Sequence, residues 1–318
     1  MKDAPLVSIV IPAYNHEAFV QQTLDSIEAQ SYPNIEVVLV NDGSRDRTGA
    51  IAQAHARRSR HKFTYLEHPN QGLVKTVARG YANSTGEMVS FLASDDWLFP
   101  DKIEVQVRDM LDNDADAVYG NVANVMADRV PRTYKGAREF LGHWDPDAFI
   151  ERLVTAHGPM LQAGLFRRSL IEAIGGVDQG LEQEDWPIHI LVARTARKVR
   201  VHVEPVVYYR YHGGNMVLTK SRQLVQWKIA IADKYLTGRT RRRAKGSAHD
   251  VHARTCATTD PWGSLRHFLL AQLYFPRGSR RSGYWRKVLL RGLPDWGWRV
   301  LHHRGKPTAG EASGGPLQ

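Results

Sequence analysis

The stretch FLASDDWLFPDK, residues 91–102, joins the end of an apolar run to two adjacent carboxylates, Asp95 and Asp96. The preceding residues, EMVSFLA at 87–93, are typical of a strand that is covered on both faces of a sheet. Adjacent carboxylates repel each other, so their place after a buried strand needs an explanation. Either Asp96 or Asp101 caps the following helix, or the carboxylates bind a divalent cation.

Upstream of this stretch, the sequence alternates between strand and helix patterns. Strands are predicted at 6–12, 35–40 and 63–68, and helices at 16–30, from the turn at 41–48 to about residue 58, and at 72–84. Repeated units of this kind predict a doubly wound, mostly parallel α/β sheet, which is a Rossmann-like architecture. Ligands bind beyond the carboxyl ends of such strands, where polar clusters fall at 12–15, 41–44, 68–72 and 94–96.

Downstream of residue 115 the pattern is less regular. Residues 115–127 predict a strand, a turn and a strand, and residues 163–178 predict a short strand followed by a helix. A further helix is expected at 184–196, and two short strands separated at Pro205 are expected within 199–212.

Charge divides the 318-residue chain near residue 220. Residues 220–304 hold 19 Lys/Arg and 4 Asp/Glu, and the remainder carries a net charge of −5 within the total of +10. We therefore expect a first domain at 1–219, a basic and mainly helical region at 220–304, and a disordered tail at 305–318. The single cysteine, the absence of a signal-peptide pattern and the absence of about 18 consecutive apolar residues predict a cytoplasmic protein.

Three further polar features are candidates for function. Asp42, in the sequence NDGS, suits an ordinary turn, but it shares the predicted sheet edge with Asp95. Glu184 and Asp185 open a predicted helix, where an acid is favoured by the helix dipole or acts as a general base. His212 follows a predicted strand and precedes two glycines, so it is either structural or a contact for a metal or phosphate. No dinucleotide glycine turn, P-loop, G-x-S-x-G, H-E-x-x-H or C-x-x-C motif is present in the sequence.

Six stretches within residues 6–217, taken in their order along the chain, resemble the family 2 glycosyltransferases of the GT-A fold. They are VSIVIPAYN, VVLVNDGSRDRT, HPNQGLVKTVARGYANSTGE, FLASDDWLFPDKIE, GLFRRSLIEAIGGVDQGLEQEDW and VYYRYHGGN. The resemblance implies a nucleotide-sugar site, whose members follow by role. Pro12, Tyr14 and Asn15 would line the nucleotide pocket, and Asp42 would contact the base. The diphosphate and base would be contacted by Asn70, Gly72 and Arg79, and Asp95 would lie near the ribose. The metal would be bound by Asp96 and His212, and Asp185 beside Glu184 would be the catalytic base.

The resemblance also implies inverting transfer of one sugar, with Mn²⁺ or Mg²⁺ as cofactor and a UDP-sugar as the expected donor. The motif Q-x-x-R-W of processive members is missing, which favours single-sugar transfer over polymer synthesis. Acceptors would be a cell-surface glycan or a lipid-linked precursor. Two alternatives stay open: a catalytically silent protein that binds nucleotide sugars or acts as a scaffold, and a nucleotidyltransferase.

The basic region 220–304 contains five tryptophans among its arginines. It is expected either to pack on the catalytic domain or to bring the protein to an anionic membrane surface, as a peripheral protein at the inner face of the cell membrane. Nucleic-acid binding is disfavoured, because the basic run GRTRRRAKG is not accompanied by a nucleic-acid-binding motif.

Overall fold

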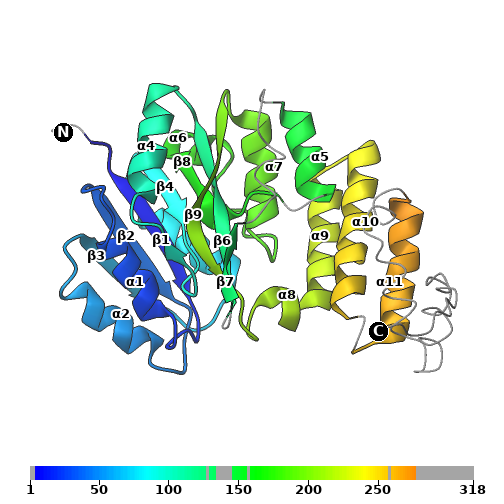
Figure 1. The fold of residues 1–318 in the computed structure, drawn as a ribbon, viewed down its shortest axis with the longest axis horizontal. Helices are drawn as coiled ribbons and strands as arrows, with labels where there is room; N and C mark the ends of the chain where they lie inside the picture. The colour runs from blue at the N-terminus through cyan, green and yellow to red at the C-terminus, as the bar shows by residue number, and fades with distance from the viewer. Residues whose placement is uncertain (1–3, 127–128, 134–144, 156–157, 257–258, 277–318) are drawn as a thin grey trace, which may run out of the picture.

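The computed structural model describes residues 4–126, 129–133, 145–155, 158–256 and 259–276 (Figure 1). The predicted tail at 305–318 lies outside these residues, as do residues 257–258 and 277–304 of the basic region. The strands are β1 (Val7–Ala13), β2 (Ile35–Asn41), β3 (Lys62–Glu67), β4 (Met88–Phe91), β5 (Trp97–Leu98), β6 (Ala117–Met126), β7 (Arg129–Thr133), β8 (Gly164–Arg167) and β9 (Val199–Arg210). They form one sheet in the order β3-β2-β1-β4-β8-β6-β9-β5, and β7 pairs with β6.

The first half of the sheet is parallel, as the repeated strand–helix pattern predicts. Strand β1 lies between β2 and β4 in parallel register, and β3 runs parallel to β2. The second half is mixed, because β8 runs antiparallel to both β4 and β6. Strands β6 and β9 are parallel to each other, while the short strand β5 is antiparallel to β9.

Two predicted breaks in the second half do not exist. Residues 117–126 form the single strand β6 instead of two strands, and residues 199–210 form the single strand β9. Pro205 is accommodated within β9 opposite Asn121, where the register between β6 and β9 shifts. Such an irregularity lets a strand continue past a residue that has no backbone N–H to donate.

Helices cover both faces of the sheet. Residues of β1 alternate between two hydrophobic clusters: Ile9 and Ile11 pack with α1 (Val20–Glu28) and α4 (Lys102–Asp112), while Val10 packs with α3 (Leu73–Ala82). Gly80 allows α3 to approach closely, since a Cβ atom there would lie 2.5 Å from the Val10 side chain. The helix α2 (Thr48–Ala56) contributes to the first cluster, and α6 (Arg168–Ala173) and α7 (Asp185–Thr195) contribute to the second.

The helices after residue 215 pack on this core instead of forming a separate one. They are α8 (Met216–Thr219), α9 (Ser221–Tyr235), α10 (Gly238–Thr255) and α11 (Pro261–Tyr274); α5 (Pro146–Thr155) and the 3-10 turn η2 (Leu161–Ala163) precede them. Ile231, Leu236 and Ala244 belong to the same buried cluster as Trp186 of α7. Helix α10 lies between α9 and α11, so that α11 is the outermost layer (Figure 1).

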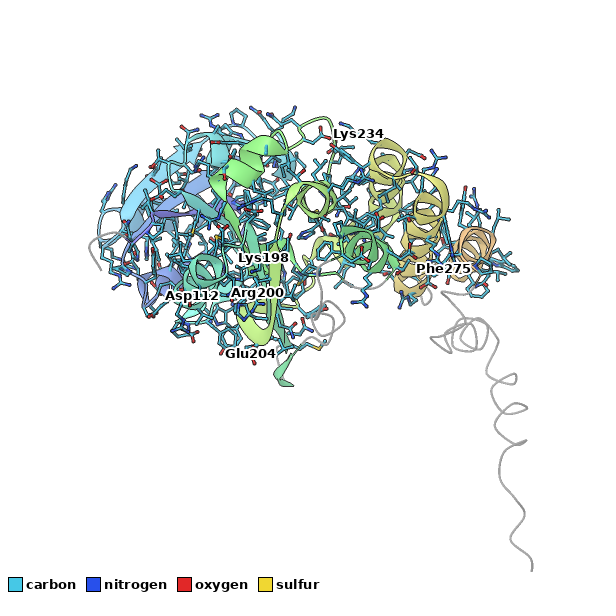
Figure 2. The ribbon with its side chains drawn as sticks, turned by 90° about the horizontal axis from the view of Figure 1, so that it is seen from above. Asp112, Lys198, Arg200, Glu204, Lys234 and Phe275 are labelled. Atoms are coloured by element: carbon cyan, nitrogen blue, oxygen red, sulfur yellow. The ribbon has the colours of Figure 1, made fainter. Side chains whose placement is uncertain are left out.

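Polar contacts reinforce this junction. Asp178, in the loop before α7, accepts hydrogen bonds from Lys234 at 2.5 Å and from the hydroxyl of Tyr235, both on α9. Figure 2 shows Lys234 at the boundary between the sheet and the helical layer, with Phe275 at the far end of that layer. Glu151 of α5 is likewise paired with Arg243 of α10. Among the described residues, no helix is both long and apolar enough to cross a bilayer.

Candidate active site

The carboxyl ends of β1, β2 and β4 bring the predicted polar clusters together. Ala13 pairs with Asn41 in the parallel register, and the Asp42 N–H donates to the Ala13 carbonyl at 2.8 Å. The residues beyond β4 follow at the same edge, because β4 runs parallel to β1. The edge predicted from the strand–helix pattern is therefore where these side chains meet.

Asp42 organises the loop that precedes α3. Its carboxylate is buried and accepts the backbone N–H groups of Gln71 at 2.7 Å and Gly72 at 3.0 Å. Gly72 adopts φ +90°, which favours glycine, and is the residue immediately before the helix. Asn70 lies in the same loop and is exposed. The predicted contact of Asp42 with a nucleotide base would therefore use the remaining lone pairs of an already engaged carboxylate.

Arg79 lies apart from this loop. It is in the last turn of α3, seven residues after Gly72, which corresponds to about 10 Å along a helix axis. The predicted contact of Arg79 with the diphosphate and base stays a prediction. Lys75, which the sequence analysis did not single out, is exposed in the first turn of α3 and is the cation of that helix nearest the loop.

The loop after β1 is held by Asn15. Asn15 has φ +52°, its N–H donates to Ser44 Oγ at 3.0 Å, and its side-chain oxygen accepts the Arg45 N–H at 2.9 Å. Helix α1 consequently begins at Val20, later than the predicted start at residue 16. Tyr14 in the same loop is 43% exposed, which leaves its ring available to a ligand. Pro12 is the last but one residue of β1, and its predicted place in the nucleotide pocket stays a prediction.

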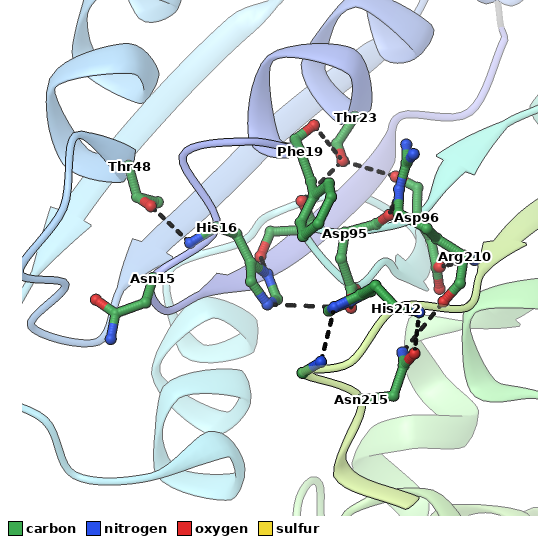
Figure 3. Close-up of polar contacts among 12 residues, drawn as sticks. Asn15, His16, Phe19, Thr23, Thr48, Asp95, Asp96, Arg210, His212 and Asn215 are labelled. Atoms are coloured by element: carbon green, nitrogen blue, oxygen red, sulfur yellow. Dashed lines mark hydrogen bonds and ion pairs between the residues drawn. The ribbon is translucent and has the colours of Figure 1, made fainter. Parts of the chain in front are cut away.

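Asp95 faces two histidines from distant parts of the chain (Figure 3). His212 Nε2 lies 2.9 Å from Asp95 Oδ2, and His16 Nε2 lies 4.0 Å from the same oxygen. One ligand atom from each of the three residues lies within 4.8 Å of the others. The sequence analysis missed His16, although its position just after β1 places it at the predicted edge.

The arrangement suits a divalent cation. Bonds of about 2.1 Å put neighbouring ligands of an octahedral ion about 3 Å apart and opposite ligands about 4.2 Å apart. The two distances from Asp95 Oδ2 fall near these values. The side chains of His16, Asp95 and His212 are 25%, 14% and 17% exposed, so a substrate can reach the same point.

Asp96 points away from this group. It is buried, and its two oxygens accept the Arg210 N–H at 2.9 Å and the Gln162 side-chain amide at 2.9 Å. Burial and the neighbouring Asp95 raise the pKa of Asp96. Its side chain thus ties the β4 loop to the end of β9, and neither Asp96 nor Asp101 caps α4 through its side chain. Asp95, and not Asp96, faces the two histidines; the predicted roles of the two aspartates at the ribose and the metal stay predictions.

The second acidic pair lies at the start of α7. A short connection leads from the end of α7 into β9. Strand β9 is parallel to β6, and β4 and β6 are both antiparallel to β8, so β9 runs in the same direction as β4. The first turn of α7, with Glu184 and Asp185, therefore lies at the same edge of the sheet as Asp95. Both acidic pairs therefore lie at one edge of the sheet.

The environment separates the two acids of this pair. Burial and the neighbouring Asp185 raise the pKa of Glu184 to about 8. Asp185 accepts only the N–H of Trp186, at 2.7 Å, among the hydrogen bonds of the described residues. Lys228 of α9 lies over the Trp186 ring, 4.5 Å from its centroid. The raised pKa of Glu184 favours its protonated form at neutral pH.

Comparisons with known proteins agree with this architecture. The family model of glycosyl transferase family 2 matches residues 8–175, more than half of the chain. Glycosyltransferase EpsH of Bacillus subtilis is 28% identical over 238 residues, which are 72% of this chain and 67% of EpsH. Glycosyltransferase GlyA of Streptococcus pneumoniae is 37% identical over 115 residues, which are 36% of this chain and only 16% of GlyA. The chain belongs to glycosyl transferase family 2.

Solved structures confirm the GT-A fold. Staphylococcus aureus TarS 1–349 in complex with UDP-GlcNAc has a TM-score of 0.58 at 18% identity, over 88% of this chain and 75% of that one. The mannosyltransferase PcManGT of Pyrobaculum calidifontis, in complex with GDP-Man and Mn²⁺, has a TM-score of 0.56 at 18% identity, over 95% and 80%. At this identity the likeness concerns the fold alone.

Proposed function

We propose that this family 2 glycosyltransferase transfers one sugar from a nucleotide diphosphate sugar to an acceptor hydroxyl with inversion. The observation that carries the proposal is the meeting of two different acidic groups at one edge of the sheet. Asp95 lies with two histidines, and Asp185 lies at the start of α7. The first group suits the charged end of a donor, and the second suits a proton acceptor.

The nucleotide would bind against the first three strands. Asp42 keeps the Asn70–Gly72 loop in place, and Tyr14 presents an exposed ring beside it at the end of β1. A ring and a carboxylate are suited to a flat base that carries N–H donors. A UDP-sugar is the donor we favour.

The diphosphate would lie near Asp95 and His212, with Lys75 as a further cation at the start of α3. When bound, Mn²⁺ or Mg²⁺ would neutralise charge on the departing nucleotide diphosphate. The protein would keep Asp95 in place through two hydrogen bonds. Arg210 donates to the Asp95 carbonyl at 2.9 Å, while His212 donates to the Asp95 carboxylate.

The acceptor hydroxyl would give its proton to Asp185. A general base must be able to take up a proton at the working pH. Glu184, with a pKa raised to about 8, is mostly protonated at neutral pH, so Asp185 is the base we propose. As the proton moves to Asp185, the acceptor oxygen bonds to the anomeric carbon on the face opposite the nucleotide diphosphate, whose bond to that carbon breaks. This single displacement inverts the anomeric configuration. Glu184 then acts as a positioning residue for Asp185.

A screen of donors tests the proposal. Binding and hydrolysis of UDP-, GDP- and dTDP-sugars are measured with Mn²⁺ and with Mg²⁺. We expect binding and slow hydrolysis of at least one donor, abolished in Asp95→Ala. Binding without hydrolysis or transfer would favour the silent binding protein, release of pyrophosphate from a nucleoside triphosphate would favour the nucleotidyltransferase, and binding of no donor would overturn the assignment.

A lipid-linked acceptor is favoured by the outer face of α11. Trp262, Leu269 and Leu273 are 82%, 58% and 67% exposed, and with Arg266 they lie on one stripe of the helix. An apolar stripe interrupted by a cation suits the interface of an anionic membrane. The basic run of α10 is partly neutralised, because Arg243 pairs with Glu151 and Lys245 pairs with Asp233; this argues against nucleic acid.

Vesicle sedimentation tests the membrane proposal. The full chain is expected to bind vesicles containing anionic lipid and to bind neutral vesicles weakly. Replacing both Leu269 and Leu273 by serine should reduce binding, while Leu111→Ser, an exposed leucine of α4, serves as the control. Equal and negligible binding to both kinds of vesicle would remove this proposal without affecting sugar transfer.

A further inference from the structure

His16 has no role in the proposed transfer so far, although it completes the group around Asp95. It follows β1, whereas Asp95 follows β4 and His212 follows β9, so three separate strand ends contribute one ligand atom each. Figure 3 shows the two imidazoles on either side of Asp95. An imidazole that approaches a carboxylate without a hydrogen bond to it, at 4.0 Å, leaves room for an ion between them.

The surroundings hold His16 in the orientation of a ligand. Its Nδ1 lies 2.8 Å from Ser94 Oγ, and its backbone N–H donates to Thr48 Oγ1 at 2.8 Å. A hydroxyl that accepts the Nδ1 proton leaves the lone pair on Nε2, the nitrogen that faces Asp95. Histidines that bind metals are commonly oriented in this way, through a hydrogen bond from the other ring nitrogen.

His212 is arranged differently. Its Nδ1 accepts the Gly214 N–H at 3.2 Å, and its Nε2 donates to Asp95 at 2.9 Å. To bind a cation through Nε2, His212 must move its proton to Nδ1 and give up the Gly214 contact. Gly213 has no atom within 4 Å of a Cβ position, so the loop has space for that adjustment. His16 needs no such change, and it is the better prepared of the two imidazoles.

We propose that His16 is a third protein ligand of the cation, and that it makes this site select Mn²⁺ over Mg²⁺. The inference rests on the proposed function, because it concerns the cation of that same site. Two imidazoles with one carboxylate suit borderline transition ions, whereas Mg²⁺ prefers an all-oxygen shell. The side chains of His16, Asp95 and His212 are 25%, 14% and 17% exposed, so an ion bound by them would be accessible to the donor's phosphate oxygens.

Cation binding is measured directly on the full chain, without nucleotide. Free Mn²⁺ is titrated by its electron paramagnetic resonance signal, and Mg²⁺ is added as a competitor. The main variant is His16→Phe, which keeps a ring against Phe19 but has no ligand nitrogen. His202→Phe, on β9 and paired with Asp109, is the matched control, and Ser94→Ala tests the positioning hydrogen bond.

We expect His16→Phe to weaken Mn²⁺ binding by at least about tenfold, with a smaller effect on Mg²⁺, so that the preference for Mn²⁺ falls. Ser94→Ala should weaken Mn²⁺ binding less, and His202→Phe should not change it. Mn²⁺ affinity within twofold of the wild type in a folded His16→Phe protein would overturn the inference while leaving Asp95 and the proposed transfer intact. A wild-type protein that transfers sugar but has no measurable Mn²⁺ site would also overturn it.

Discussion

Exchanging Glu184 for glutamine separates the roles of the two acids at the start of α7. With a pKa of about 8, Glu184 is mostly protonated at pH 7, and glutamine has nearly the same shape without a charge. Glu184→Gln should therefore retain transfer within about threefold of wild type at pH 7. Asp185→Asn removes the proposed base and should lower the rate by about 10²- to 10⁴-fold.

The same substitution predicts a change in stability with pH. The pKa of Glu184 rises from 4.5 in the unfolded chain to about 8 in the folded protein, and each unit corresponds to about 1.4 kcal/mol. The contribution of Glu184 to the unfolding free energy is fully present below pH 4.5. It is lost as the pH rises toward 8, because the unfolded chain releases the proton at lower pH than the folded protein does. The full shift amounts to about 5 kcal/mol, and partial exposure of the side chain reduces this to about 2–4 kcal/mol.

Urea unfolding at pH 5, 7 and 9 measures this effect. The difference in unfolding free energy between Glu184→Gln and wild type should grow with pH, whereas Glu182→Gln, an exposed neighbour, should follow the wild type. Parallel curves for Glu184→Gln and wild type would refute the raised pKa. A loss of transfer in Glu184→Gln as large as that in Asp185→Asn would refute the division of roles.

Three further substitutions test other parts of the structure. Lys102 is buried, and burial lowers its pKa to about 7. Its Nζ donates a hydrogen bond to the Ser90 hydroxyl at 2.8 Å, and that hydroxyl donates to the Gly164 carbonyl. Lys102→Met should raise the unfolding free energy at pH 7 by about 1–4 kcal/mol, as measured by urea unfolding. The increase of the wild-type unfolding free energy between pH 7 and 10.5 should become smaller in the variant, and an unchanged pH profile would contradict this. Asp42→Asn should lower the unfolding free energy by about 1–3 kcal/mol, because the amide has one acceptor oxygen for the two loop N–H groups that the carboxylate accepts on separate oxygens. It should also weaken UDP binding about tenfold in calorimetry, and unchanged affinity would exclude a role of this loop in nucleotide binding. Asp178→Ala should accelerate trypsin cleavage within α9 and α10 while donor hydrolysis continues, and equal cleavage rates would show that its contacts with Lys234 and Tyr235 do not hold the junction.

The parallel half of the sheet could be predicted because its signal is local. Buried strands such as β1 and β2 are runs of β-branched residues, and short connections between strands and helices restrict the topology. The carboxyl edge followed from that topology, and so did the grouping of Asp42 and Asp95. The second half was predicted less well, because β8 enters the sheet in the reverse direction and β9 passes through Pro205 by means of a register shift.

The roles of individual site residues were harder to predict. Arg79 and Lys75 are four residues apart on one helix, and only their positions along α3 show which lies near the Asp42 loop. His16 is one of 14 histidines, and no spacing in the chain relates it to Asp95 or His212. Its significance depends on the three strand ends from which these residues extend.

The sequence by itself determined the family, the alternation of strands and helices, and the edge of the sheet where the acids gather, because these depend on local patterns and on the rules of chain connection. Only the tertiary structure decided which of two adjacent aspartates faces the site. Asp95 lies in a turn closed by the Asp96 N–H, which donates to the Ala93 carbonyl at 3.2 Å. Leaving this turn, Asp95 meets the histidines while Asp96 is buried against Arg210 and Gln162. Neighbours from distant segments gave the two identical side chains different environments.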